Sequence, residues 1–204
     1  YDKRDPFNGF VLELLKELPD FRSRIEFESG SVGPKSFKLW NLVSFKKFVS
    51  NLTDLTTRSI TDFDEAYLKD AAEGVKLFLE KARGHVPMWD LMLSGKISAQ
   101  ELREQYVVGH AVFLEALGLY GAVMVNNHLM YGKTEGVDRF EVMERLESLV
   151  PERTAPVWEG RCVVAGRMQK TSDGVKGTAA TLMGLCGLNL TPTVAETEMR
   201  LGTL

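Results

Sequence analysis

The residues best suited to chemistry in this chain are basic, and one group of them precedes an expected helix. Residues 158–172 combine Arg161, Arg167 and Lys170 with hydroxyl groups and glycines. Arginine grips phosphate oxygens through two parallel hydrogen bonds, and the free N–H groups at a helix N-terminus attract anions. This pattern predicts phosphate contacts. The alternative is an ordinary loop whose arginines pair with Glu159 or Asp173.

A second basic group lies in the segment from Pro34 to Ile60, where Asp54 is the only acidic residue. The whole chain has 25 basic and 28 acidic residues and a net charge of −3, so it lacks the overall charge of a dedicated nucleic-acid binder. Charge runs are also common on purely solvated faces. The candidate DNA-contacting residues are Lys35, Lys38, Lys46, Lys47, Arg161, Arg167 and Lys170.

Patterns that would indicate catalysis or metal binding are absent from the sequence. The histidines His85, His110 and His128 are isolated, without the spacing of a helix-borne zinc site. No P-loop, Rossmann glycine motif or Gly-x-Ser-x-Gly turn occurs. We therefore expect no enzyme activity, catalytic residue, metal or cofactor in these 204 residues. His110 is expected in the core, its ring satisfied by a carboxylate or carbonyl, with a functional role as the alternative.

Two features indicate the compartment and the extent of the chain. Cys162 and Cys186 are the only cysteines and are flanked by apolar residues, which is typical of reduced thiols in the cytoplasm. The chain begins at Tyr1 without a signal-peptide pattern. We expect it to be part of a longer cytoplasmic protein.

The elements that must position these residues are mostly helices, because apolar residues recur at helical spacing. Residues 51–61 are polar and predict a linker, and turn residues predict loops at 29–36 and 131–136. Ser172 or Asp173 is expected to cap the helix that ends at Leu185. Helices are predicted over residues 6–18, 42–52, 62–84, 98–105, 106–130, 140–149 and 175–185, with a last one opening at Thr191-Pro192.

The most apolar segment, residues 106–130, is expected to be a buried central helix. His110 and Glu115 interrupt its apolar run, which argues against a membrane span, and its glycines favour close helix packing. The only strand signal is a short extended piece at residues 161–165. The fold class is therefore all-α or nearly so: one domain over residues 1–204, an irregular multi-helix bundle around the central helix with at most a short strand pair.

The order of several short segments points to a family. They are residues 1–6 (YDKRDP), 35–42 (KSFKLWNL), 101–107 (ELREQYV) with His110 and residues 116–118, 158–161 (WEGR), 166–168 (GRM) and 185–192. In this order they resemble the C-terminal half of DndB-type proteins, the DGQHR-domain family associated with DNA phosphorothioate modification systems. The resemblance spans nearly the whole chain and depends on order and spacing, since no single motif is catalytic.

The resemblance implies that the defining Asp-Gly-Gln-His-Arg motif lies upstream of Tyr1, because it does not occur in this chain. It also implies a repressor-like, DNA-binding regulator of the modification gene cluster. This part would supply the helical scaffold and phosphate contacts. DNA and other modification-system proteins are the implied partners.

Two other functions stay open from the sequence alone. One is a nuclease- or nucleotide-dependent enzyme component with its active site upstream of Tyr1. The other is a protein-interaction module of a modification or restriction complex. The sequence does not determine the DNA target or whether modified DNA is distinguished. It does not determine the oligomeric state either, and a homo-oligomer is possible.

Overall fold

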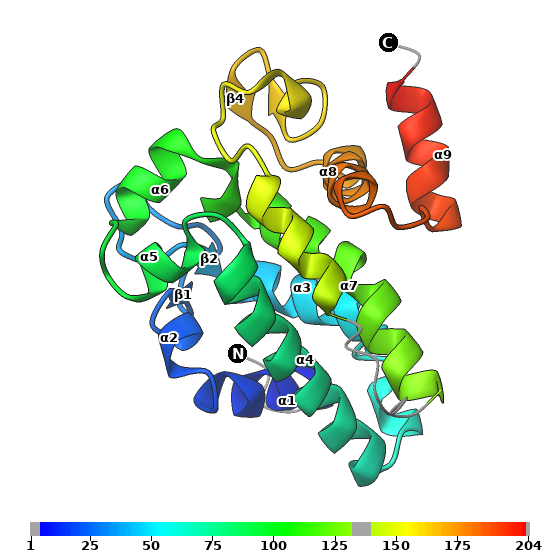
Figure 1. Cartoon of the computed structure of the whole chain (residues 1–204). Helices are drawn as coiled ribbons and strands as arrows, with labels where there is room; N and C mark the ends of the chain where they lie inside the picture. The colour runs from blue at the N-terminus through cyan, green and yellow to red at the C-terminus, as the bar shows by residue number, and fades with distance from the viewer. Residues whose placement is uncertain (1–4, 132–139, 203–204) are drawn as a thin grey trace.

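The computed structural model describes residues 5–131 and 140–202, and over these it is mostly helical, as the sequence predicts (Figure 1). Most of the predicted loop at 131–136 lies outside the described residues. With η marking a 3-10 helix, the helices are α1 (Pro6–Lys16), α2 (Pro19–Arg22), α3 (Leu42–Thr53), η1 (Ile60–Asp62), α4 (Glu65–His85), α5 (Trp89–Leu93), α6 (Ala99–Gln105), η2 (Val107–Gly109), α7 (Ala111–Tyr131), η3 (Glu141–Ser148), η4 (Pro156–Trp158), α8 (Ser172–Leu185) and α9 (Pro192–Leu201).

The predicted central helix is confirmed as α7, which packs against α3, α4 and α8 (Figure 1). Its first three turns are almost wholly buried, through Val112, Phe113, Leu114, Ala116, Leu117 and Tyr120. Within the described residues, no helix is both long enough and apolar enough to cross a membrane.

The start of the central helix differs from the prediction, because α7 begins at Ala111 and not at Tyr106. Tyr106 pairs with Glu152 in an isolated β-bridge, and the Val107 amide donates to the Pro151 carbonyl at 2.8 Å. These non-local hydrogen bonds hold the backbone before α7 in another conformation.

Two glycines of α7 let its neighbours approach unusually closely. A Cβ atom on Gly118 would lie 2.6 Å from the backbone carbonyl oxygen of Phe48 in α3. A Cβ on Gly121 would lie 2.5 Å from both the Leu52 side chain and the Phe78 ring. The predicted packing role of these glycines is confirmed.

Strand structure is confined, in the described residues, to two short pairs. β1 (Ile25–Glu26) pairs in parallel with β2 (Trp40–Asn41). β3 (Val163–Val164) pairs antiparallel with β4 (Arg167–Met168) around a two-residue turn, as the extended piece at 161–165 suggests. Ala165 and Gly166 have φ of 49° and 72°, as a tight hairpin turn with two left-handed residues requires.

Two other predictions are corrected by the structure. Residues 51–61 are not a linker, since α3 continues to Thr53 and the side chains of Leu55 and Ile60 are buried. The predicted helix at 140–149 is the 3-10 helix η3, whose apolar residues Met143, Leu146 and Leu149 recur every three positions. Side chains three apart align along a 3-10 helix, so this spacing suits it.

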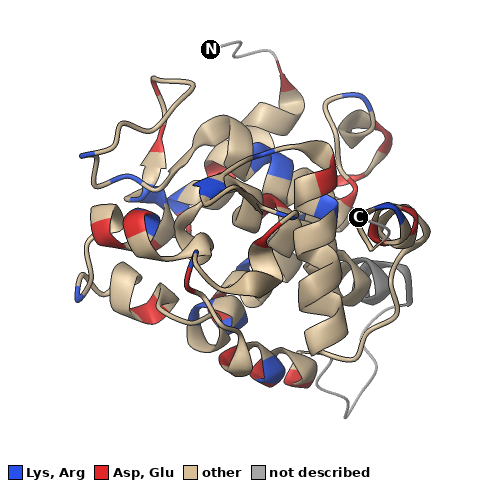
Figure 2. Ribbon diagram, turned by 90° about the horizontal axis from the view of Figure 1, so that it is seen from above, with Lys and Arg blue, Asp and Glu red and all other residues tan. Residues whose placement is uncertain are grey.

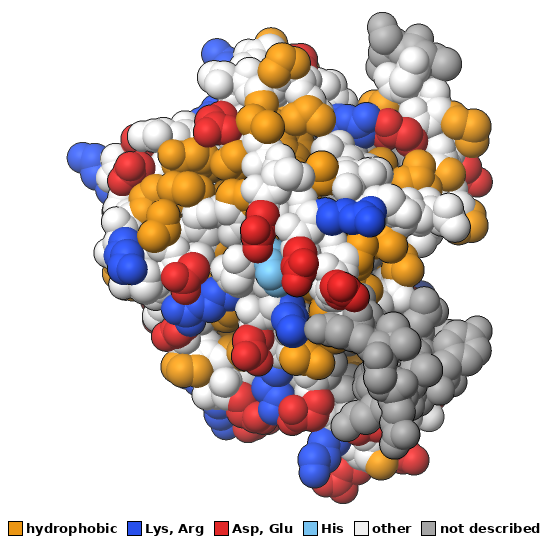
Figure 3. Space-filling view, viewed as in Figure 1, with side chains coloured by type: hydrophobic (Ala, Val, Ile, Leu, Met, Phe, Trp, Pro, Cys, Tyr) orange, Lys and Arg blue, Asp and Glu red, His pale blue; other side chains and the backbone are white. Residues whose placement is uncertain are grey.

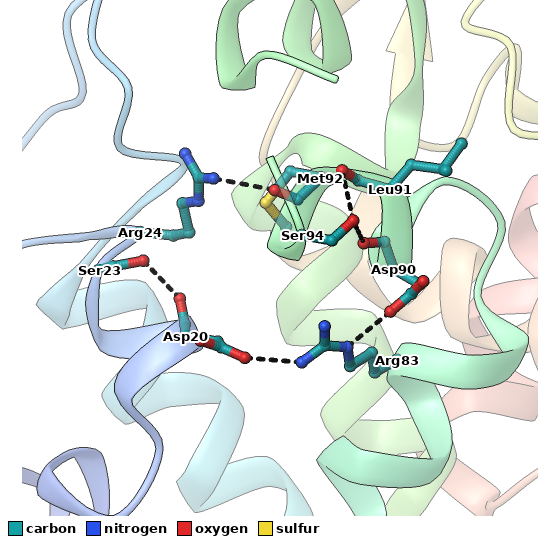
Figure 4. A network of polar contacts seen from close by, with 8 residues as sticks. All are labelled: Asp20, Ser23, Arg24, Arg83, Asp90, Leu91, Met92 and Ser94. Atoms are coloured by element: carbon teal, nitrogen blue, oxygen red, sulfur yellow. Dashed lines mark hydrogen bonds and ion pairs between the residues drawn. The ribbon is translucent and has the colours of Figure 1, made fainter. Parts of the chain in front are cut away.

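Away from α7, an arginine network connects α2 to the α4–α5 corner (Figure 4). Arg83 of α4 donates to Asp20 at 2.7 Å and to Asp90 at 2.8 Å. Arg24 donates to the Met92 carbonyl at 2.9 Å. These contacts orient the chain that leads through β1 towards the basic residues of the 34–60 segment.

The close approach at Gly118 gives a direct test of this packing. Gly118→Ala is expected to lower the free energy of unfolding by about 1–3 kcal/mol, because the added methyl group overpacks against a backbone oxygen that cannot rotate away. Urea unfolding measures the change.

Gly9→Ala in α1 is the matched control, because nothing lies within 4 Å of the added Cβ. It is expected to stabilise the protein by about 0.5–1 kcal/mol through helix propensity. Equal effects of the two substitutions would contradict the packing account.

Candidate nucleic-acid interface

The seven predicted DNA-contacting residues do not share one surface. On the face seen in Figure 3, basic and acidic side chains are interspersed, and Figure 2 shows charged residues of both signs spread over the chain. The structure separates the seven residues by what each cation already contacts.

Lys46 lies on α3 and serves a structural contact. Its ammonium is 3.1 Å from Asp5 and 5.8 Å from the centre of the Phe7 ring. Asp5 also caps α1 by accepting from the Phe7 amide at 3.0 Å. The ion pair therefore joins α3 to the start of α1 and neutralises the lysine.

Lys35 and Lys38 lie in the loop between β1 and β2. Lys38 donates to the Ser23 carbonyl at 3.0 Å, whereas Lys35 is exposed without a described contact. Arg103 of α6 holds this loop by donating to the carbonyls of Pro34 and Ser36 at 2.9 and 2.7 Å. The loop is thus anchored, and Lys35 projects from it.

Arg161 precedes the β3–β4 hairpin and is engaged by α9. Its guanidinium donates to both carboxylate oxygens of Glu198, at 2.6 and 2.5 Å, and to the Gly177 carbonyl at 2.7 Å. The hydrogen bonds from Arg161 lower the pKa of the Glu198 carboxyl. Of the two alternatives that the sequence left open, Arg161 fits the loop whose arginines pair with carboxylates. Its partner is Glu198, which is far from it in the sequence.

Arg167 lies just after the hairpin turn, where its side chain is exposed without a described partner. The turn itself is held in place. The Ala165 amide donates to Glu159 at 2.7 Å, and Arg153 donates to the Gly166 carbonyl at 3.2 Å. Arg167 is accordingly available on a supported loop.

The remaining two predicted residues, Lys47 and Lys170, meet in one cleft together with Lys176. We call this the basic cleft, a pocket of about 400 Å³. α3, α7 and the first turns of α8 form its walls. Its lining residues are Lys47, Asn51, Glu115, Leu119, Lys170, Thr171, Ser172, Val175 and Lys176.

The N-terminus of α8 opens into the basic cleft. Thr171 caps this helix, accepting from the Gly174 amide at 2.9 Å, so the predicted caps Ser172 and Asp173 are wrong by one and two positions. Thr171 has the extended backbone that a cap requires, whereas Ser172 is already helical. The positive end of the helix dipole adds to the lysines there and favours an anion.

A buried carboxylate forms part of the cleft wall. Glu115 of α7, whose side chain is 8% exposed, accepts from Lys170 at 2.7 Å. Asn51 donates to the Glu115 carbonyl at 2.9 Å, which joins α3 to the same turn of α7. Lys170 is therefore partly a structural residue, while no described carboxylate pairs with Lys47 or Lys176.

Lys176 was not among the residues selected from the sequence. It lies in the second turn of α8. The sequence signal that could have found it is the predicted helix cap after Lys170, which places Lys176 near the start of the same helix. Lys47 reaches the same cleft from α3. The residues around Lys47 in the sequence give no indication of this position. α3 and α8 both pack against α7, and this arrangement brings the three cations to one cleft.

A larger pocket of about 670 Å³ is lined in part by Val163 and Gly166 of the β3–β4 hairpin. Glu104, Glu152 and Glu159 line it together with Arg153. Arg153 is committed to the carbonyls of Glu104 and Gly166, both at 3.2 Å. With three carboxylates and a single engaged cation, this pocket is poorly suited to phosphate.

His110 and the cysteines lie outside the cleft. The prediction for His110 is confirmed: its Nε2 donates to the Arg103 carbonyl at 2.8 Å, and burial lowers its pKa to about 4. Cys162 and Cys186 are free and buried, and burial raises the pKa of both thiols. These groups have the environments of core residues.

The depressed pKa of His110 predicts a pH-dependent stability. His110 binds its proton near pH 6.5 in the unfolded chain but only near pH 4 in the folded protein. The stability that depends on a neutral His110 is therefore fully present above pH 6.5 and is lost as the pH falls from 6.5 to 4. It is expected to fall by up to about 3 kcal/mol as pH drops through that window. His110→Gln should flatten this part of the curve in urea unfolding, and parallel curves for the two proteins would count against it.

The Lys170–Glu115 pair predicts a structural cost for removing the lysine. Lys170→Ala is expected to destabilise the fold by about 1–3 kcal/mol, since a buried carboxylate loses its partner. Lys170→Ala/Glu115→Gln should recover most of that loss, and Lys176→Ala, the control, should stay within about 0.5 kcal/mol of wild type. Thermal or urea unfolding compares them, and a Lys170→Ala protein as stable as the control would refute the role.

Comparison with known proteins assigns a family to this chain. A family model described as DndB, DNA-sulfur modification-associated, matches residues 1–189. No curated protein and no solved structure matches the chain significantly. The match covers every described element except α9. The chain therefore belongs to the DndB family of DNA-sulfur modification-associated proteins.

Proposed function

We propose that this chain is part of a repressor-like, DNA-binding regulator of a DNA phosphorothioate modification gene cluster. In this proposal the basic cleft contacts the DNA backbone. The supporting observation is the convergence of Lys47, Lys170 and Lys176 on one cleft at the N-terminus of α8. Family membership supplies the biological setting.

The cleft lysines contribute unequally to this proposed role. Lys47 and Lys176 have no described ion-pair partner, so their charges are available to phosphates. Lys170 is neutralised by Glu115 and mainly shapes the wall. Lys35 and Arg167, both exposed, are candidates for additional contacts outside the cleft.

The net charge of −3 does not prevent local binding. Exposed charges farther apart than about 8 Å are largely screened at physiological ionic strength. A phosphate in the cleft would therefore respond mainly to the nearby lysines and helix terminus. Backbone contacts of this kind supply affinity and orientation but no sequence information, so base recognition would come from other groups.

A salt titration of binding to duplex DNA tests the proposal. The logarithm of the affinity falls by about 0.9 per phosphate contact for each unit of log salt. Lys47→Ala/Lys176→Ala is expected to weaken binding and to reduce the slope by about 1.8. Both substitutions remove lysines without described partners, so the fold should be unaffected.

Lys69→Ala/Lys96→Ala is the matched control, because it removes the same charge from exposed lysines outside the cleft. It should leave the slope close to that of the wild type. Equal slopes for the two double variants would exclude the cleft. No salt-dependent binding by wild type would favour the protein-interaction module over the regulator.

A further inference from the structure

The loop between β1 and β2 presents an aromatic ring and a cation to solvent. Phe37 is 66% exposed, one of the most exposed large hydrophobic side chains in the described part of the chain. The Lys38 ammonium lies 4.8 Å from the centre of its ring, and Lys35 is exposed two residues before it. We call residues 31–38 the basic loop, because they contain these two lysines and no acidic residue.

Arg103 of α6 fixes the shape of the basic loop. Its guanidinium donates to the carbonyls of Pro34 and Ser36, at 2.9 and 2.7 Å, and to the Lys38 carbonyl. An exposed ring on an anchored loop loses little conformational freedom when a partner binds it. The apolar surface of Phe37 can therefore contribute to association.

A surface of the opposite charge lies at the next residues of α6. The pocket of about 670 Å³ beside the hairpin, which we call the acidic pocket, holds Glu104, Glu152 and Glu159 against a single guanidinium, that of Arg153. Among the described residues, no lysine or arginine forms an ion pair with any of these three carboxylates. The acidic pocket is thus left with an excess of negative charge.

The two surfaces complement each other in charge and in polarity. The basic loop carries two cations, and the acidic pocket has two more carboxylates than cations. Its apolar lining comes from Ala155, Pro156 and Val163. Figure 3 shows hydrophobic side chains gathered at the upper left of the molecule, where Figure 1 places α6 and the hairpin, with acidic side chains beside them. An aromatic ring flanked by lysines suits such a pocket.

Both surfaces adjoin α6, so one region of the molecule carries both halves of the contact. Arg103 binds the basic loop, while the next two residues, Glu104 and Gln105, line the acidic pocket. A two-fold interface requires a self-complementary patch of this kind. A two-fold axis near α6 would bring the basic loop of each copy to the acidic pocket of the other.

We propose that this chain forms a two-fold homodimer in which the basic loop of each copy docks in the acidic pocket of the other. Phe37 contacts the apolar lining, and Lys35 meets the carboxylates of the second copy in place of solvent or DNA. The inference does not depend on the proposed DNA contact, because neither surface includes a residue that lines the basic cleft.

Analytical ultracentrifugation over a range of protein concentrations tests the proposal. The mass of wild type is expected to rise with concentration from that of one chain towards that of two. Phe37→Ser should raise the dissociation constant by about tenfold or more, since buried aromatic anchors dominate interface energetics. Val43→Ser is the matched control, because Val43 is also 66% exposed but belongs to neither surface. It should associate like wild type.

Charge reversal tests which two surfaces meet. Lys35→Glu and Glu152→Lys should each abolish association, because each places like charges in both contacts of the dimer. Glu152 is chosen because its carboxylate makes no described hydrogen bond. An equal mixture of the two variants should associate again, since both contacts of the mixed dimer then pair opposite charges. Lys69→Glu, which reverses an exposed lysine of α4, is the control and should associate like wild type.

Each outcome either supports or overturns the homodimer. Recovery of association in the mixture supports the docking of loop in pocket, and it shows that both variants are folded. A monomeric wild type overturns the proposal and would leave the acidic pocket to a basic segment of another protein. Equal association of Phe37→Ser and Val43→Ser, charge reversals without effect, or a mixture that stays monomeric also overturn it. None of these measurements involves DNA, so the regulator proposal stands or fails separately.

Discussion

The close approach of α3 and α4 to α7 is the constraint on which the rest of this structure depends. Gly118 and Gly121 remove the Cβ atoms that would collide with the Phe48 carbonyl and with Leu52 and Phe78. With α3 so near, Asn51 reaches the backbone of α7 at Glu115. The same approach places Lys47 at one wall of the cleft whose other wall is the start of α8. The cleft thus results from how the core packs.

The basic residues divide into those that hold the fold together and those left for a partner. Lys46, Lys170 and Arg161 each pair with a carboxylate from a distant segment. Such pairs contribute little to stability at the surface. Losing one matters where the carboxylate is buried, as that of Glu115 is. Alanine substitutions at Lys170 or Arg161 therefore change packing as well as charge. Lys47, Lys176 and Arg167 are better probes of binding because they lack described ion pairs.

An acidic protein with a local cationic cleft suits graded binding better than permanent attachment. The helix terminus and the two unpaired lysines of the cleft would supply a limited attraction for an anion. Small changes at such a site would alter the affinity for a phosphate by modest factors, which would suit the proposed regulatory role. Sequence recognition would need groups that read base edges, a task that backbone contacts do not perform.

Much of the fold could be predicted from local sequence, because helix periodicity, caps and proline positions are properties of neighbouring residues. The buried α7, the packing glycines, the carbonyl-bonded ring of the mostly buried His110 and the free, buried cysteines all follow from such signals. Local sequence did not predict three features: the start of α7, the 3-10 form of η3, and the burial of Leu55 and Ile60. Each of these depends on contacts with remote segments.

The candidate site is likewise determined partly by local sequence and partly by tertiary structure. The residue types alone gave seven candidates for phosphate contacts, and Lys176 was not among them. Only the tertiary structure decided that Glu198 pairs with Arg161, that Asp5 pairs with Lys46 and that Lys47 and Lys176 line one cleft. These distances are set by packing between parts of the chain that are far apart in sequence.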